Sequence, residues 1–226
     1  GASIIDIGAE SSKPGSKRIS IKEELKKIKP ILKKIKIQYS GILVSIDTYK
    51  SELAKECVSL GADIINDISA GDMDKDMFKT IAKLQVPYVM NHMQGEPENM
   101  QLNPQYENVT NDIIKIFKRK INILTKLNFN NIIIDPGFGF GKNLNHNYTL
   151  LNELDKFKQL NLPILVGISR KSMITKALGV TTENSLNGTT VANTIAIMKG
   201  AKILRVHDVK EAMECLKINK FLFHNS

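Results

Sequence analysis

Tryptophan is absent from this 226-residue sequence, and cysteine occurs only twice, at Cys57 and Cys215. The two cysteines are far apart and match no metal-binding spacing, so the sequence excludes a disulfide framework and a cysteine-based zinc site. No apolar run approaches the roughly 18 residues needed to cross a bilayer, and the first residues show no basic, cleavable leader. We therefore predict a protein of a reducing compartment, the cytoplasm, with no membrane partner.

Acidic residues are also in short supply, since 23 Asp and Glu face 32 Lys and Arg and leave a net charge of +9. Such an excess can indicate nucleic acid, a membrane surface or small anionic substrates. The densest lysine run, residues 22–36, alternates with apolar side chains at helical spacing, which is typical of a packed helix with one solvated face. No aromatic interleaving or known binding motif accompanies it, so we predict no nucleic-acid partner.

Short runs of β-branched residues alternate with helical stretches over the whole chain, which we take as a single domain, residues 1–226. The runs are nearly continuous in apolar character, as expected for a parallel sheet covered on both faces. Between the first two runs, Ser20 and Glu23 form a capping box, and Pro30 is expected to kink or split the helix that follows. The seven predicted strands are residues 4–8, 42–47, 63–68, 87–93, 132–137, 164–169 and 203–208.

Polar residues gather where each predicted strand ends, and this favours a (β/α)₈ barrel over an open doubly wound sheet, because only a barrel brings all strand ends to one mouth. A barrel needs eight strands, and the opening Gly1-Ala2-Ser3 is typical of a turn that follows a helix. We therefore expect the first β/α unit of the barrel to precede Gly1. The polar residues at strand ends are Glu10, Ser11, Asp47, Asn66, Asp67, His92, Asp135, Lys171, Arg205 and His207.

Residues 135–142 read Asp-Pro-Gly-Phe-Gly-Phe-Gly-Lys directly after a predicted strand. Alternating glycines allow a ligand to approach the backbone closely, and the two phenylalanines offer flat apolar walls. The spacing fits neither a Walker A loop nor a dinucleotide-binding fingerprint. The alternative is a glycine-rich turn in which Asp135 acts as a local cap.

Residues 167–172, Gly-Ile-Ser-Arg-Lys-Ser, place two cations and two hydroxyls at the start of a predicted helix, which suits an anion site or simply a solvated basic turn. Arg205 and His207 are two apart on the next predicted strand and should face the barrel mouth together. The planar donor fork of Arg205 suits pyrophosphate. Alternatively, Arg205 pairs with Asp47 or Asp67.

Asp47 and Asn66 end neighbouring predicted strands. Asn66 shares parity with Ile64, so its amide should point into the barrel, whereas Asp47 could equally cap the next helix. Buried amides and carboxylates must find partners or cost about 1–3 kcal/mol each. Several of them around one mouth therefore indicate a polar heterocyclic ligand, while His92 fits a structural role better.

Five segments, residues 4–15, 45–48, 135–142, 169–172 and 205–208, together resemble the dihydropteroate synthase family in order and separation. The resemblance implies a transferase of folate biosynthesis that condenses (7,8-dihydropterin-6-yl)methyl diphosphate with 4-aminobenzoate, giving 7,8-dihydropteroate and pyrophosphate. It implies a largely dissociative displacement, Mg²⁺ as cofactor, and a homodimer formed through the last helices, where Ala192 and Ala196 are small.

The resemblance also assigns roles to individual residues. The pterin is expected at Asp47, Asn66, Asp135, Lys171 and Arg205. The pyrophosphate is expected at Arg205 and His207. The 4-aminobenzoate and its sulfonamide mimics are expected at Ser12, Lys13, Pro14, Phe140, Lys171 and Ser172. The catalytic set is expected to be Asp47, Lys171, Arg205 and His207.

Two departures from the family pattern affect these expectations. Lys13 replaces the usual arginine, so bidentate contacts there are in doubt. The family's metal-binding asparagine belongs to the first strand and its mobile loop, so the metal ligands are unknown and turnover by residues 1–226 alone is expected to be impaired. The alternative functions are a pterin-dependent methyltransferase that acts on a corrinoid, and a non-catalytic pterin- or anion-binding module.

Overall fold

The structure is a computed structural model that describes residues 1–10 and 18–224. All seven predicted strands are present and pair in parallel, and each is shorter than predicted. The last two are the shortest, with two residues each where we predicted six. The strands are β1 Ile4–Ile7, β2 Leu43–Asp47, β3 Ile64–Asp67, β4 Tyr88–Asn91, β5 Ile132–Asp135, β6 Leu165–Val166 and β7 Ile203–Leu204.

Helices follow the strands in alternation. The predicted capping box at Ser20 and Glu23 opens the first of them. Pro30 was expected to kink or split this helix, and the split is wrong, because α1 continues through this residue. Pro30 and Lys26, whose carbonyl loses its helical partner, are both exposed, so water can bond the freed carbonyl. The helices are α1 Ile21–Gln38, α2 Ser51–Ser59, α3 Met77–Leu84, α4 Val109–Lys126, α5 Leu144–Asn152, α6 Ser172–Leu178, α7 Leu186–Met198 and α8 Val209–His224, with short 3₁₀ turns at Leu154–Leu160 and Glu183–Ser185.

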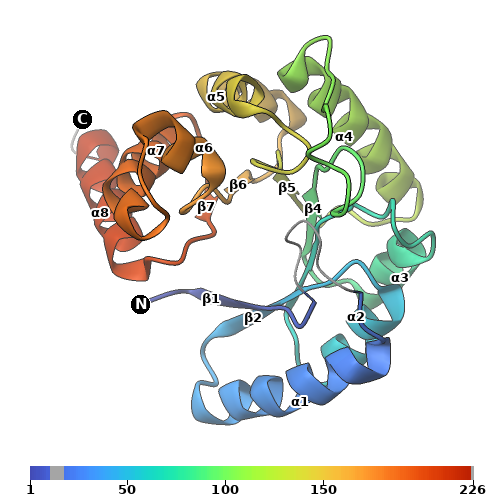
Figure 1. Ribbon diagram of the computed structural model, residues 1–226. Helices are drawn as coiled ribbons and strands as arrows, with labels where there is room; N and C mark the ends of the chain where they lie inside the picture. Colours follow the sequence, from blue (N-terminus) through green and yellow to red (C-terminus); the bar gives the residue numbers. More distant parts are fainter. Residues whose placement is uncertain (11–17, 225–226) are drawn as a thin grey trace.

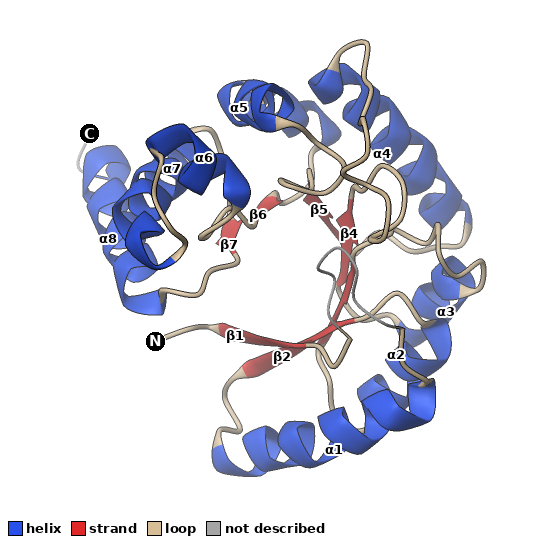
Figure 2. Ribbon diagram, viewed as in Figure 1, coloured by secondary structure: helices blue, strands red, loops and turns tan. Residues whose placement is uncertain are grey.

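The strands form a curved parallel sheet with the helices on its convex side (Figures 1 and 2). Strands β1 to β5 are hydrogen-bonded in sequence order, β6 pairs with β7, and a bridge between Ile134 and Ile164 joins the two groups. Among the described residues β7 pairs with β6 alone, so β1 and β7 are the two ends of the strand order. No helix in residues 1–10 and 18–224 is both long and apolar enough to span a membrane.

Both faces of the sheet are buried, which explains the continuous apolar runs. The convex face packs against the helices in the main core, and the concave face carries a small separate cluster. Each fully buried aliphatic side chain contributes about 1.5–3 kcal/mol to folding. The concave cluster consists of Ile64, Val89, Ile133 and Leu165, with Ile4 and Ile203 packed against it.

A polar layer lies directly above this apolar cluster. Because side chains alternate along a strand, the residue two positions further on faces the same side. Asp6 follows Ile4, Asn66 follows Ile64, and Asp135 follows Ile133 in this way. Asp47 stands opposite Asn66 in the register of β2 and β3. The fold therefore places apolar residues at the base of the concave side and carboxylate and amide groups at the carboxyl ends of the strands.

Candidate functional site

Arg205 joins the two ends of the strand order. Its Nε donates to Asp6 Oδ2 at 2.7 Å, and its Nη2 donates to Asp47 Oδ2 at 3.1 Å. Asn66 Nδ2 also donates to Asp6 Oδ2, at 3.1 Å. The two bonds of Arg205 use two of its five guanidinium N–H groups. Because the Arg205 side chain is 47% exposed, the other three N–H groups can bond a ligand. The predicted alternative, pairing with Asp47, is thus realised, while Asp67 takes no part.

Asp6 is a site residue that the sequence analysis did not single out. It receives bonds from Arg205 and Asn66, and its Oδ1 is buried without a hydrogen-bond partner among the described residues. The available signal was its parity with Ile4 in β1, which is the argument that placed Asn66.

Asp47 does not cap the helix that follows it. Helix α2 begins at Ser51, and the Ser51 backbone N–H bonds Asp74 Oδ2 at 2.7 Å. Burial, together with the neighbouring Asp6 carboxylate, raises the pKa of Asp47 to about 7, while the Arg205 guanidinium opposes the shift. The Asp47 carboxyl group, at the mouth of the site, therefore exchanges its proton near neutral pH.

Two other polar groups at strand ends have structural partners. Asp67 accepts from the Tyr88 hydroxyl at 2.6 Å and from Ser69 and Gly71, which fixes the turn after β3. His92 is buried and lies 3.1 Å from the ammonium of Lys142. The structural role predicted for His92 agrees with this placement.

Asp135 ends β5 and faces the site, but one of its oxygens is engaged locally. Oδ1 accepts from the Gly137 backbone N–H at 2.8 Å, while Oδ2 has no donor among the described residues. The local cap given as the alternative is therefore present, and the predicted contact of Asp135 with a ligand stays a prediction for which Oδ2 is available. Burial raises its pKa, and the cation of Lys171 opposes the rise.

The glycines after Asp135 serve internal packing more than ligand approach. Gly137 and Gly141 have φ of +74° and +61°. A Cβ on Gly137 would lie 1.8 Å from the His92 carbonyl oxygen, and one on Gly141 would lie 2.4 Å from that of Gln94. At Gly137 and Gly141 the space that a side chain would need is thus occupied by the β4–α4 loop, while the approach of a ligand to this segment stays a prediction.

Lys171 enters the site from the end of the β6 loop. Its Nζ donates to the Phe138 carbonyl oxygen and lies 4.5 Å from the centroid of the Phe140 ring. Burial lowers the pKa of Lys171 to about 8, against the attraction of Asp135. A cation held between a carbonyl and an aromatic face beside Asp135 can bind an electron-rich or anionic group.

The rest of the basic segment divides into two roles. Arg170, at φ +55°, bonds Asp208 through Nε at 2.9 Å and Nη2 at 2.8 Å, and so ties two loops together. His207 lies beside Ser169, with 3.0 Å between Nδ1 and the Ser169 Oγ. Strand β7 ends at Leu204, so the strand parity predicted for Arg205 and His207 is wrong, and a loop carries both. Ser172 begins α6 and is exposed.

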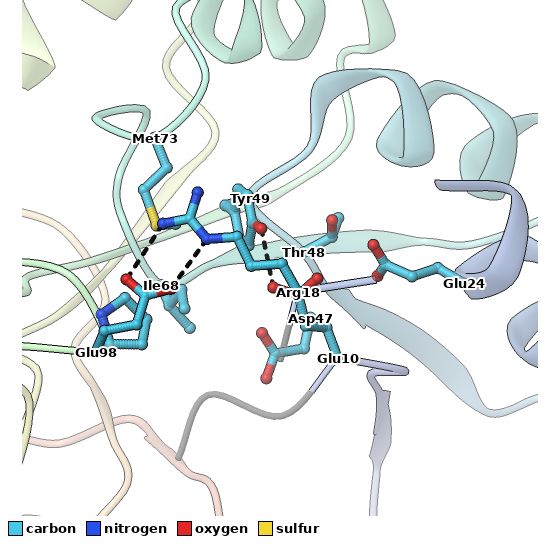
Figure 3. A pocket seen from close by; sticks show the side chains of 10 residues that line it. Glu10, Arg18, Glu24, Asp47, Thr48, Tyr49, Ile68, Met73 and Glu98 are labelled. Carbon is cyan, nitrogen blue, oxygen red and sulfur yellow. Dashed lines mark hydrogen bonds and ion pairs between the residues drawn. The ribbon is translucent and has the colours of Figure 1, made fainter. Parts of the chain in front are cut away.

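Ser12, Lys13 and Pro14, and also Ser11, lie outside the described residues. The described residues on either side of this segment border a small pocket that extends to Asp47 (Figure 3). Arg18 borders it as well and pairs with Glu96 at 2.6 Å and with Glu98 at 3.1 Å. The lining residues are Glu10, Arg18, Glu24, Asp47, Thr48, Tyr49, Ile68, Met73, Pro97 and Glu98.

Comparison with known proteins adds to this geometry. The family described as "pterin binding enzyme" matches residues 1–207. Dihydropteroate synthase of Escherichia coli strain K12 is 41% identical over 220 residues, which cover 96% of this chain and 77% of that protein. The enzyme of Clostridium beijerinckii is 42% identical over 225 residues, which cover 98% and 81%.

Solved structures agree with the sequence relatives. The Yersinia pestis dihydropteroate synthase with a sulfonamide drug complex matches with a TM-score of 0.94 at 40% identity, over 98% of this chain and 81% of that one. The Xanthomonas albilineans enzyme with 4-aminobenzoic acid matches with a TM-score of 0.91 at 32% identity, over 98% and 80%.

The curved parallel β/α fold and the family match over residues 1–207 define a pterin-binding enzyme with the fold of a β/α barrel. This confirms the predicted fold class. Within that class, the chain belongs to the dihydropteroate synthase family and is a transferase of folate biosynthesis.

Proposed function

We propose that this chain binds (7,8-dihydropterin-6-yl)methyl diphosphate and 4-aminobenzoate in the polar layer, and forms 7,8-dihydropteroate and pyrophosphate there. The observation that carries the proposal is the Arg205 guanidinium, which is fixed by Asp6 and Asp47 beside Asn66 and keeps unused donors. A carboxylate and amide group thus adjoins a cation, as a pterin with an anionic leaving group requires.

Asp135, Asn66 and Asp47 suit the pterin ring. The Asp135 Oδ2 can accept from ring amino and amide N–H groups, and such charge-assisted bonds are about twice as strong as neutral ones. Lys171, which Asp135 attracts, is proposed to contact the pterin and the second substrate, and the Phe140 ring against it suits the second substrate. Ser172 is exposed at the start of α6, and the parts assigned to Ser12, Lys13 and Pro14 remain predictions.

The chemistry needs charge stabilisation more than proton transfer. The methylene–oxygen bond breaks, and its electron pair leaves with the diphosphate, where Arg205 and His207 are proposed to receive the charge. The amine of 4-aminobenzoate then attacks the methylene carbon, the carbon–nitrogen bond forms, and the amine releases a proton. Asp47, with its pKa near 7, lies where it can stabilise the transient cation.

Magnesium stays a prediction that the described residues do not support by themselves. Residues 1–10 and 18–224 contain no group of three or more His, Cys, Asp or Glu side chains that could hold a metal ion. The carboxylates of Asp6 and Asp47 in the polar layer are both paired with the Arg205 guanidinium. Accordingly, no step of the proposal passes through a metal.

A homodimer through the last helices is part of the proposal, although the residues first offered for it are wrong. Ala192 and Ala196 are buried in the chain's own core and cannot contact a partner. The neighbouring Val191, Ile195 and Met198 are exposed and form one stripe along α7, four and three residues apart. This stripe supports a second copy of the chain as the occupant.

The cytoplasm is the proposed location. Both cysteines, Cys57 and Cys215, are buried and free. Free buried thiols are ordinary in a reducing compartment.

The deciding experiment mixes the protein with the pterin diphosphate, Mg²⁺ and labelled 4-aminobenzoate. We expect pyrophosphate and labelled dihydropteroate in equal amounts. A corrinoid methyltransferase or a simple binding module would give neither product. As a site test, Asp135→Asn should weaken pterin binding far more than 4-aminobenzoate binding, and equal effects on both ligands would contradict the assignment of Asp135.

A further inference from the structure

Lys142 is a buried cation that the proposed reaction does not use. It is 3% exposed, and its Nζ lies 2.8 Å from the Gly137 carbonyl oxygen, 3.0 Å from that of Phe140 and 3.1 Å from His92 Nδ1. In its ammonium form Lys142 carries three protons and can only donate, so the three acceptors then match it fully and the proton of His92 lies on Nε2. Burial lowers the pKa of both Lys142 and His92.

The two carbonyls bound by Lys142 belong to the turn formed by residues 137–141. Other side chains bond further polar groups of this turn. The Gly139 N–H donates to Asn147 Oδ1 at 2.7 Å, and the Gly141 carbonyl accepts from the Tyr106 hydroxyl at 2.8 Å. The turn is therefore bonded by Asn147 of α5, by Tyr106 of the β4–α4 loop and by Lys142.

The same turn contacts Lys171 in three ways. The Phe138 carbonyl accepts from Lys171 Nζ, the Phe140 ring lies against that ammonium, and Gly139 is so close that a Cβ would lie 3.2 Å from Lys171 Cδ. Any change in the shape of the turn must therefore move the Lys171 cation or the Phe140 ring. Asp135 depends less on the turn, because the β5 strand carries it.

We infer that Lys142 is a positioning residue, which shapes the turn of residues 137–141 so that Phe138 and Phe140 hold the Lys171 ammonium toward the second substrate. The substrate half of this inference rests on the proposed function. The structural half, the hold of Lys142 on the turn, stands on the contacts alone.

Lys120 offers a matched control. It is also a buried lysine, 4% exposed, and it also bonds two turn carbonyls, those of Ser69 at 3.2 Å and Ala70 at 2.8 Å. Its turn follows β3 and has no contact with Lys171 among the described residues. Lys142→Met and Lys120→Met therefore each remove an ammonium that bonds two turn carbonyls, and only the turn held by Lys142 contacts Lys171. Lys120 also pairs with Asp72 at 2.6 Å, so its loss disturbs its own turn at least as strongly.

The structural half is tested by fluorescence, since the chain has no tryptophan. Phe140→Trp gives a single indole on the turn, and quenching by acrylamide reports its exposure. We expect Lys142→Met in this background to raise the quenching constant about twofold or more by local opening, and Lys120→Met to leave it unchanged. An unchanged constant in the Lys142→Met protein would overturn the inference.

The substrate half is tested by kinetics with Phe140 intact. Lys142→Met should raise the KM for 4-aminobenzoate by about tenfold or more and that for the pterin diphosphate by less than about threefold. The reason is that the second substrate loses both Lys171 and Phe140, whereas the pterin keeps Asp47, Asn66, Asp135 and Arg205. Lys142→Arg should recover part of the loss. Equal changes in both KM values, or the same KM split in Lys120→Met, would refute the positioning role.

If Lys142→Met does not fold, His92→Phe removes one acceptor at similar volume and must change quenching and the KM ratio in the same direction, or the inference fails. If the unaltered protein forms no dihydropteroate, the proposed function fails, and the quenching comparison still decides whether Lys142 holds the turn.

Discussion

Arg205 contributes a fixed donor fork rather than a mobile charge, because Asp6 and Asp47 hold two of its N–H groups. We expect Arg205→Ala to lower kcat by about 10²–10³-fold, the range found when one donor to a developing anion is removed. Arg205→Lys keeps the charge but loses the fork and should recover only part of the rate. Steady-state kinetics decide this, and near-normal kcat in Arg205→Ala would remove Arg205 from the mechanism.

Lys171 should give the enzyme an upper pH limit. Because its pKa is lowered to about 8, the ammonium is lost as pH rises through that value, and kcat/KM for 4-aminobenzoate should fall there. The free energy of unfolding should instead increase as pH rises from 8 to 10, because in that range the unfolded chain binds more protons than the folded one. Lys171→Arg should abolish the limb near pH 8, and a limb that persists in this variant would assign it to another group.

The sequence predicts some of these residues and not others, for physical reasons. Asn66 could be placed by its parity with Ile64 on a true strand, and the same rule would have found Asp6. Lys142 could not be identified as buried, because a lysine in a glycine-rich loop is normally solvated and its three acceptors come from two separate loops. The local role of Arg170 likewise depends on Asp208, which the sequence does not show to be near.

At the scale of elements, a buried ion cluster fixes both described ends of the β1–α1 connection. Lys50 donates to Glu10 at 2.7 Å, to the Ile19 carbonyl at 2.7 Å and to the carboxylate of Glu24, whose side chain is 2% exposed. The Tyr49 hydroxyl also donates to Glu10, at 2.9 Å. One ammonium therefore ties β1 and α1 to the loop that follows β2.

Removal of this ammonium should be costly. We expect Lys50→Met to lower the free energy of unfolding by about 3–5 kcal/mol, because it leaves two carboxylates buried without their cation. Lys36→Met is the control, since the Lys36–Asp63 pair is 24% and 31% exposed and should cost about 1 kcal/mol or less. Urea unfolding measures the free energy of unfolding of both variants. Equal decreases in the two would show that the Lys50 cluster stabilises the fold no more than an exposed ion pair does.

The positions of the elements follow from the sequence more reliably than their ends do. Continuous apolar runs located all seven strands because both faces of the sheet are buried. The strand ends were overestimated where polar residues follow. After Leu204 the Arg205 N–H still bonds the Val166 carbonyl at 2.9 Å, and the register with β6 ends there. The split predicted at Pro30 was wrong because the Lys26 carbonyl, which loses its helical partner there, is at an exposed position where water can bond it.

At the scale of the molecule, the exposed stripe on α7 should decide the oligomeric state. We expect Ile195→Glu to convert a dimer to a monomer in analytical ultracentrifugation, because it places a charge in an apolar contact. Ile37→Glu, at an 82% exposed position on α1, should leave the dimer intact. A protein that is monomeric before any substitution would contradict the proposed interface.

The bond between Arg205 and Asp6 spans 199 positions of the chain. A ribosome releases the amino end first, so β1 to β5 can assemble while Arg205 has not yet been made. Until it arrives, Asp6 and Asp47 face each other without a cation, and the growing chain cannot yet bind its ligand. The binding site is therefore completed only after β1 to β5 have been made, and a stop codon shortly before position 205 would leave these five strands without the guanidinium that joins Asp6 to Asp47.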